Sequence, residues 1–562
     1  MKTRIIALAV TAACASAAVA QSQYEALQFM GNELNGTARF VGMGGAMSSL
    51  GADLSTMSTN PAGIGMYRSH DVAVSFGFNN TRTNADFAGS TTKENRTRAS
   101  FDQIGFVWST KIGNKTDLRY LNFGFNYHKR ANFNRQFYAK GNLNGASMTY
   151  QMAKMIGSVA STWDDLITLW NAGIKGVDNR NPYIHEDFYS VPYLGMMGAR
   201  TNLVYGGRDS EGEFFTSWNG ETGEYYSREE GGINQYDFNL SFNVRDRFYF
   251  GMTLGLYDIN YNLYSSYGEL LNRPMPGSGS DYCDPMPELM ESEVIPNLAD
   301  FTLGNWYKAE GTGVDLKLGM IIRPFEYSPF RFGFAVHTPI WYNITDRYTA
   351  SLTSNFGYDN GSEYVGVASV TESLSDYFPD MDYVWDYCLT TPWRFNVSAG
   401  TIVGGIMALD AEYEFEKYSS AKLKDREGYE LNATSSISET LKGVHTFRAG
   451  METKLTDAFS LRVGYNYQSS PIVEDAFRNI EATDNTRTVA SYMNPKSRQA
   501  VTFGLGYRGR LFYADVAYKY DFYKGDFYAF DGGLDQSGNL LLSPTKVNNE
   551  RHQLLFTVGV HF

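Results

Sequence analysis

The feature that most constrains the fold is a period-two alternation of apolar and polar residues. Across residues 236–244, every even-numbered residue is apolar and every odd-numbered residue is polar. A β-strand points successive side chains to opposite faces, so this stretch predicts a strand with one apolar and one polar face. The apolar face must be covered either by a second sheet, as in a soluble sandwich, or by lipid, as in a membrane barrel.

The same alternation recurs along the chain and predicts about fourteen strands. Charged residues such as Asp237, Asp315 and Lys317 fall on the polar phase. This is expected for strands whose polar face lines a lumen. The predicted lipid-facing sets of the successive strands begin at Val72, Ile104, Leu121, Tyr236, Phe248, Val314, Phe330, Phe395, Met407, Phe447, Phe459, Val501, Phe512 and Leu554.

The connections between the predicted strands alternate between short and long. Residues 245–246 and 404–405 are short connections, whereas 131–232 and 261–304 are long. Short periplasmic turns and long outer loops are typical of bacterial outer-membrane barrels, and a soluble sandwich does not explain this alternation. The sequence therefore predicts an all-β, transmembrane antiparallel barrel of about 14 strands over residues 70–562, with a long extracellular loop at about 131–232.

Both ends of the chain carry targeting features. Lys2 and Arg4, a short apolar run and small residues at 18–20 predict a signal peptide over residues 1–20. The last strand alternates up to its final aromatic residue, Phe562. This ending resembles the C-terminal signal of outer-membrane barrels, so we expect the barrel-assembly machinery to bind this strand. The expected location is the bacterial outer membrane.

Composition agrees with a barrel and argues against other classes of protein. Aromatic residues make up 15% of the chain and 55 residues are Gly, which suits the aromatic girdles and strand bends of a barrel. No stretch approaches the roughly 20 consecutive apolar residues of a membrane helix. The net charge of -13 argues against nucleic acid as a partner, because binding its backbone needs a basic face.

Residues 21–69 precede the first predicted strand, and this segment is too apolar to float freely in water. Its glycines allow close backbone packing, and its Asn-Pro pair favours a turn. A dinucleotide loop is a poor fit, because no strand precedes it and no βαβ unit follows. We predict that the segment folds into the lumen as a plug, or hatch. The candidate plug and gating residues are Gly42, Gly44, Gly45, Asn60, Pro61 and Gly63.

Two motifs in this segment resemble the N-terminal hatch of the FadL/TodX family of outer-membrane transporters. They are Gly-Met-Gly-Gly-Ala at 42–46 and Asn-Pro-Ala-Gly at 60–63, joined by a spacer that contains Asp53. Segments 391–395 and 461–465 are similar to barrel strands of the same family. The resemblance covers essentially the whole chain after residue 20. It implies fourteen strands, an N-terminal plug, and transport of long-chain fatty acids or other hydrophobic compounds.

Inside the predicted loop 131–232, apolar residues recur at three- and four-residue spacing across 152–170. This spacing predicts one amphipathic helix. In the resembled family, loop helices capture hydrophobic ligands, and methionine suits an adaptable binding face. The alternative is that the stripe packs against other loop residues. The candidate capture residues are Met152, Met155, Ile156, Val159 and Trp163.

Four arginines on the polar phase of the strands are candidates for binding a carboxylate headgroup in the lumen, because a guanidinium group offers a planar fork of donors. The alternative is an ion-pair network with inward acids such as Asp410 and Glu412, which would hold the barrel in shape. No local motif allows the family's ligand residues to be transferred one by one. The four candidates are Arg394, Arg448, Arg462 and Arg508.

No cofactor and no metal are expected, because none of the seven histidines lies at metal-ligand spacing from a second His or a Cys. Cys283 and Cys388 both fall in predicted outer loops, and whether they pair is left open. The sequence contains no Gly-x-Ser-x-Gly nucleophile elbow, so it does not indicate an enzyme such as a lipase.

The sequence therefore predicts an outer-membrane channel for passive uptake of hydrophobic, fatty acid-like molecules. Ligand would collect on the outer loops and enter the lumen. A shift of the plug would then release it, sideways into the outer-membrane lipid. The alternative is a haem-binding or adhesive surface barrel without transport. A general porin fits less well, because it needs an open water path and no plug.

Overall fold

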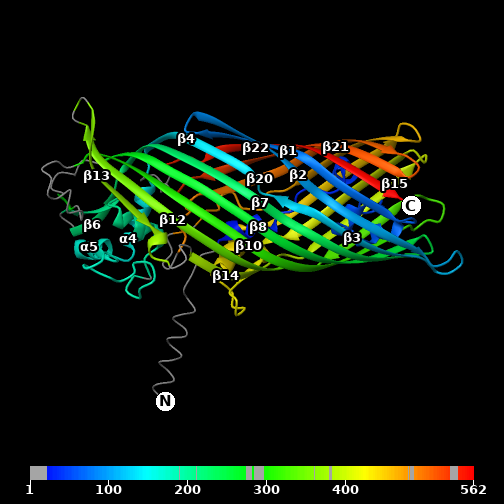
Figure 1. Cartoon of the computed structure of the whole chain (residues 1–562), viewed down its shortest axis with the longest axis horizontal. Helices are drawn as coiled ribbons and strands as arrows, with labels where there is room; N and C mark the ends of the chain where they lie inside the picture. The colour runs from blue at the N-terminus through cyan, green and yellow to red at the C-terminus, as the bar shows by residue number, and fades with distance from the viewer. Residues whose placement is uncertain are drawn as a thin grey trace, which may run out of the picture.

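The computed structural model describes residues 22–188, 190–209, 212–273, 281–283, 296–359, 361, 363–378, 383–478, 480, 486–531 and 542–562. The predicted signal peptide, residues 1–20, lies outside this part of the chain. The described residues form a closed antiparallel barrel of tilted strands (Figure 1). Its first strand, β1 (Asp71–Phe87), closes the barrel by pairing with its last strand, β22 (Thr545–His561).

Fourteen strands form the wall at the end that carries the short turns, which confirms the predicted number. Short turns lie on the periplasmic side of such barrels, so the opposite end, with the long connections, is extracellular. Between β1 and β22 the wall runs through β2 (Ser90–Lys111), β3 (Leu118–Asn132), β7 (Asn219–Val244), β8 (Phe248–Asn272), β10 (Leu298–Ile322), β11 (Arg331–His337), β15 (Arg394–Val403), β16 (Met407–Lys417), β18 (Gly443–Lys454), β19 (Phe459–Gln468), β20 (Tyr492–Arg508) and β21 (Phe512–Tyr528).

The predicted alternation decides which side chains face outward. On β8 the residues from Phe248 to Leu256 with even numbers are exposed, whereas the inward-facing Asp237 of β7 and Lys317 of β10 are fully buried. Comparable apolar side chains are exposed on the other strands and form a band, which we call the apolar belt. A closed barrel satisfies its backbone hydrogen bonds internally and can expose such a belt only to lipid.

Several strands continue well past the apolar belt. β7 has 26 residues and β8 and β10 have 25 each, whereas about ten residues suffice to span a membrane. On β8 the next outward residues after Leu256 are the polar Asp258 and Asn260. The predicted loop 131–232 is therefore shorter than expected, because β4 (Arg135–Gly145) pairs with the outer part of β7 and extends the wall.

The extracellular mouth is covered by an outer cap, which we define as residues 146–217. It contains α4 (Met148–Gly157), α5 (Trp163–Asn171) and α6 (Tyr193–Arg200), together with β5 (Val204–Asp209) and β6 (Gly212–Ser217), to which β9 (Asp281–Cys283) adds a strand (Figure 1). The prediction of one continuous helix over 152–170 is wrong. A capping box of Thr162 and Asp165 starts a new helix, α5, five residues after α4 ends.

A second group of elements continues the wall outward near β11 and β15. These elements are β12 (Trp341–Asp359), β13 (Tyr364–Ser373), η3 (Leu374–Asp376), β14 (Tyr383–Thr390), η4 (Tyr418–Ser420), β17 (Lys422–Lys424) and α8 (Ala433–Thr440). β11 ends at His337, just before Pro339, and β12 continues the wall outward from Trp341. No helix among the described residues is both long and apolar enough to cross a membrane.

The N-terminal segment lies inside the barrel, where we call residues 22–67 the plug (Figure 1). It folds into α2 (Gln23–Met30), α3 (Ala38–Gly42) and two short 3-10 helices, η1 (Leu54–Ser58) and η2 (Pro61–Met66). Nearly every residue from 38 to 65 is buried. The plug is therefore packed within the lumen, and it divides into an inner part, residues 38–67, and an outer part, residues 22–37.

Candidate functional site

The inner part of the plug packs directly onto the backbone of the barrel wall. A Cβ atom on Gly464 of β19 would lie 2.1 Å from the backbone N of Gly44, and one on Gly251 of β8 would lie 2.3 Å from the backbone of Pro61. Gly450 of β18 is in the same position against Met43. Only glycine lets two backbones approach this closely. Inward-facing glycines on separate strands thus form a surface that accepts the plug.

Asn60 holds the turn that the sequence singled out. Its side-chain oxygen accepts a hydrogen bond from the N–H of Ala62 (3.2 Å), which caps η2. Its amide nitrogen donates to the carbonyls of Ser48 (2.9 Å) within the plug and Met320 (3.3 Å) on β10. Pro61 follows at the first position of the helix. One side chain therefore stabilises the plug turn and attaches it to the wall.

The predicted plug glycines occupy close contacts in the same inner part. Gly44 and Gly45 adopt left-handed backbone conformations, with φ of 66° and 83°. A Cβ on Gly63 would lie 2.5 Å from the hydroxyl of Thr56, and one on Gly42 would lie 3.2 Å from the Cα of Gly504. The structure thus places all six predicted plug residues in the inner part, where Gly42 and Gly44 contact β19 and β20, Asn60 contacts β10, and Gly63 packs within the plug. Their role in gating stays a prediction.

Three of the four candidate lumen arginines are buried beside the plug, and each lies near a carboxylate. Arg448 pairs with Glu412 and with Glu414 (2.8 Å), and Arg394 lies 3.9 Å from Glu414. Arg508 is exposed at the periplasmic end of β20. A ligand carboxylate would have to compete with these acids, so the network matches the structural alternative. Binding of a headgroup by these arginines stays a prediction.

A chain of ion pairs continues from the wall into the plug. Arg462 contacts Asp515 (2.5 Å) and Glu452 (2.6 Å), and the plug residue Arg39 contacts the same Glu452 (2.9 Å). Arg462 on the wall and Arg39 on the plug thus share Glu452, which attaches the plug to the wall.

Above the plug, a cavity of about 310 Å³ lies between α2 and the outer wall. Aromatic side chains form part of its lining, with Phe137 and Tyr225 packed around Phe527 at centroid distances of 4.6 and 4.7 Å. Its charged groups are in ion pairs, either with each other, as Arg478 with Glu25 and Arg135 with Glu229, or with acids outside the cavity, as Arg487 with Asp346. A concave, mostly apolar space with few unpaired charges suits a hydrophobic small molecule.

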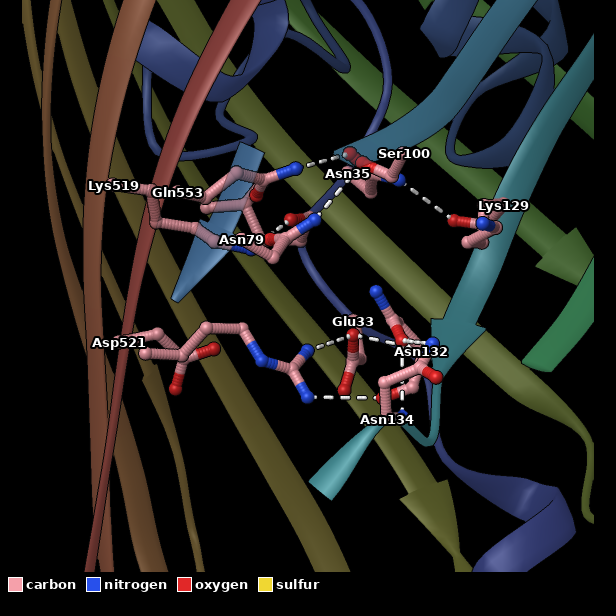
Figure 2. Close-up of polar contacts among 12 residues, drawn as sticks. Glu33, Asn35, Asn79, Ser100, Lys129, Asn132, Asn134, Lys519, Asp521 and Gln553 are labelled. Atoms are coloured by element: carbon pink, nitrogen blue, oxygen red, sulfur yellow. Dashed lines mark hydrogen bonds and ion pairs between the residues drawn. The ribbon is translucent and has the colours of Figure 1, made fainter. Parts of the chain in front are cut away.

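Two side chains in the outer part of the plug, Glu33 and Asn35, contact the wall near β3, and we call them the plug clasp (Figure 2). Glu33 accepts a hydrogen bond from Arg551 of β22 (2.6 Å) and from the N–H of Asn132 on β3 (3.3 Å). Asn35 donates to the carbonyl of Lys129 on β3 (3.0 Å). The clasp therefore connects β3 to β22, two strands that are separated in the wall by β1 and β2.

The clasp sits where the wall loses its regular pairing. β2 and β3 pair from Lys111↔Tyr120 to Gln103↔His128, yet both strands continue outward. Beyond that point, residues 129–132 of β3 pair with β7 alone, across a register shift. Asn35 bonds to the carbonyl of Lys129, and the N–H of Glu33 donates to the carbonyl of Arg130 (3.0 Å). The plug takes the place of the missing strand at this β2–β3 seam.

The candidate capture residues lie inside the outer cap. Met152, Met155 and Ile156 are fully buried, and Met152 and Met155 pack against glycines of α6. Val159 is partly buried, and the indole N–H of Trp163 donates to the carbonyl of Gly207 (3.2 Å). The structure covers this stripe, as the alternative interpretation held, and ligand capture by these residues stays a prediction.

The pairing of Cys283 and Cys388, which the sequence left open, is not decided by the described residues. Among the described residues Cys388 carries a free thiol, which donates to the side-chain oxygen of Asn343 (3.1 Å). The side chain of Cys283 lies outside them.

Sequence reasoning missed the plug clasp and the aromatic cavity. One signal pointed to Glu33, because it is one of few charged residues in a charge-poor segment, and a charge in such a segment needs a partner when buried. The cavity gave no such signal, since Phe137, Tyr225 and Phe527 lie far apart in the chain and look like ordinary strand residues.

Comparison with solved structures places this architecture among known barrels. A FadL homologue from Pseudomonas aeruginosa matches with a TM-score of 0.50 and 12% identity, covering 94% of this chain and 99% of that chain. The chain has the fold of a FadL-type barrel. At this identity the FadL-type likeness shows the fold alone.

Two toluene transporters match the FadL-type fold of this chain less closely. TodX from P. putida matches with a TM-score of 0.44 and 11% identity, and TbuX from Ralstonia pickettii with 0.42 and 12%. Each match covers 94% of this chain and 99% of the other. No family model matches the sequence, and no curated protein does.

Proposed function

We propose that this barrel is a plug-gated channel through which hydrophobic, fatty acid-like molecules pass the outer membrane by diffusion. The observation that carries the proposal is the aromatic cavity at the extracellular end of a lumen that the plug closes. A porin would need a continuous water path, and an adhesive barrel would need no internal cavity. The sequence resemblance to transporters of hydrophobic compounds agrees with this function.

In the proposed pathway, a ligand passes the outer cap and occupies the cavity against Phe137, Tyr225 and Phe527. Below the cavity the inner plug and the buried ion pairs block the lumen. Entry of a hydrophobic ligand into that polar region would cost free energy, because the charged groups of the lumen would have to be desolvated or separated. Sideways release into lipid avoids this cost.

The β2–β3 seam is the best candidate for the sideways exit. Its upper part is closed by the plug clasp and by Arg96 of β2, which donates to the carbonyl of Glu229 on β7 (2.9 Å), rather than by strand pairing. A shift of the clasp together with release of Arg96 would open it. The wall also breaks near Pro339, but there hydroxyl groups bridge the strands: Thr338 accepts from the N–H of Leu316 (3.0 Å), and Thr391 accepts from that of Ile340 (2.8 Å). The backbone N–H groups of Leu316 and Ile340 at that break therefore have hydrogen-bond partners in the wall itself.

Ligand binding by the intact barrel tests the proposal. Val489 lines the cavity from an irregular segment, so Val489→Trp should fill space without breaking a strand. We expect delipidated wild-type barrel to bind radiolabelled palmitate, and Val489→Trp to weaken that binding at least tenfold. The control is Val177→Trp, because Val177 is exposed on the outer cap. A wild-type barrel that binds neither palmitate nor toluene, or that binds haem instead, would overturn the proposal.

A further inference from the structure

Three arginines, of which Arg98 and Arg228 are on the outer surface of the wall and Arg96 is largely buried, converge on a single carboxylate. Arg96 and Arg98 of β2 and Arg228 of β7 all contact the same oxygen of Glu230, the last at 2.7 Å. The side chains of Arg98 and Arg228 are 43% and 48% exposed. One carboxylate balances one of these positive charges, so two remain available to an external anion.

Two aromatic rings lie beside this cluster and are also exposed. Tyr264 of β8 and Trp306 of β10 face outward with ring centroids 5.4 Å apart. They border a shallow hollow of about 400 Å³ that Arg228, Lys308 and Arg347 also line. Arg347 makes no ion pair with any residue that the structure describes. We call Arg96, Arg98, Arg228, Tyr264, Trp306, Lys308 and Arg347 the outer patch.

The height of the outer patch narrows the choice of partner. On β8 the apolar belt ends at Leu256, and on β10 it ends at Val314. Tyr264 and Trp306 lie further out along the same strands, at a height of roughly 20 Å above the belt for strands that rise about 3.4 Å per residue with a tilt of about 40°. The acidic Asp258 and Glu310 lie in between. Lipid tails cannot reach the patch, whereas the saccharides of the outer leaflet can.

We propose that the outer patch binds the phosphorylated saccharide of an outer-leaflet glycolipid. Guanidinium groups match phosphate in charge and in bidentate geometry. Tyr and Trp add large, flat, amphipathic surfaces, on which sugar rings can stack. Basic clusters next to a membrane recognise lipid headgroups in the same way. This site is separate from the lumen and does not depend on the hydrophobic ligand of the channel.

Binding of rough lipopolysaccharide to the purified full-length barrel tests this site. The probe is lipopolysaccharide with a phosphorylated core, compared with the same material after removal of phosphate by hydrofluoric acid. Binding is measured by native mass spectrometry and by the part of the change in tryptophan fluorescence that is absent in Trp306→Ala. We expect dephosphorylation, and the double change Arg98→Gln with Arg228→Gln, each to weaken binding at least tenfold. Trp306→Ala should weaken it several-fold in the mass spectrometric assay.

The matched control is Arg245→Gln, because Arg245 is another exposed arginine in an ion pair, at the periplasmic end. It should leave binding unchanged. Heat-dependent gel migration and palmitate binding should stay at wild-type values in every variant, which separates this site from the channel. Equal binding of both glycolipid preparations, or a loss of binding in the control as large as in the double variant, would overturn the proposal. Inorganic phosphate that competes as strongly as the glycolipid would overturn the saccharide assignment.

Discussion

The inner and outer parts of the plug are attached to the barrel by different kinds of contact. The inner part lies backbone to backbone on wall glycines such as Gly464 and Gly251. The outer part is attached mostly through polar side chains, among them Glu33 and Asn35 of the clasp and Glu25 with Arg478, and by one backbone bond from the N–H of Glu33. Close backbone packing cannot loosen without separating two rigid surfaces, whereas side-chain contacts can exchange one at a time. For the proposed function, we therefore expect gating to start in the outer part and to leave the inner seal in place.

The largest effect is expected from a change that breaks the inner seal. In Gly464→Val the new side chain would collide with the backbone of Gly44, so the plug must move. We expect a loss of about 3 kcal/mol of stability, and a barrel that conducts ions in a planar bilayer. Gly366→Val is the control, because its nearest contact would be 3.8 Å away. A sealed Gly464→Val barrel of normal stability would contradict the rigid inner part.

A smaller effect is expected when the inner part loses one anchor but keeps its packing. Asn60→Ala removes the cap of η2 and the bonds to Ser48 and Met320. We expect a cost of about 2 kcal/mol, the upper end of the range for lost helix caps, measured as a lower midpoint of urea unfolding. Asn80→Ala, which removes surface bonds to Asn95 and Thr97, should change that midpoint little. If both variants unfold alike, the turn is not an anchor.

The outer part should loosen by itself when the clasp is weakened. Glu33→Gln removes the charge that Arg551 and Arg498 contact. We expect hydrogen exchange at residues 31–37 to become about tenfold faster, equivalent to about 1.4 kcal/mol, with faster palmitate uptake and no change at residues 42–51. Glu224→Gln, at an exposed pair with Lys140, is the control. Faster exchange across the whole plug would show that the two parts move as one.

The smallest effect is expected in the outer cap above the cavity. It sharpens the comparison by showing whether the cap loosens with pH while the plug does not. Glu269, on the part of β8 beyond the apolar belt, accepts bonds from the hydroxyl of Ser147 (2.5 Å) and the N–H of Met148 (2.8 Å) at the start of α4. Burial raises the pKa of the Glu269 carboxyl to about 7.

Folding raises this pKa, so the protonated Glu269 carboxyl stabilises the folded cap. This stabilisation is complete below the ordinary pKa of glutamate and is lost as pH rises through about 7. We expect α4 amides, corrected for chemical exchange rates, to exchange up to about tenfold faster at pH 8 than at pH 5.5. Glu269→Gln should remove this dependence, and Glu221→Gln, at a surface bond with Asn272, should keep it. The same pH dependence in the plug clasp would contradict a separate cap.

The membrane barrel could be predicted because its physical cause is local. Alternation in a strand assigns each side chain to lipid or lumen regardless of what lies elsewhere, and Asp237 and Phe238 show both outcomes side by side. The plug motif was also visible, because close packing requires glycines and an Asn-Pro turn at particular positions. The outward extension of β7, β8 and β10 was missed, because polar residues on both faces look the same in a loop and in a wall above the membrane.

The sequence by itself determined the period of the strands, their number and the presence of an apolar, glycine-rich segment ahead of them. Tertiary structure alone decided which of these residues meet. The cavity joins Phe137, Tyr225 and Phe527, the clasp joins Glu33 to Arg551, and the outer patch joins Arg96 to Arg228. The physical reason is that barrel closure and strand register set these distances, and neither is encoded in any short stretch of the chain.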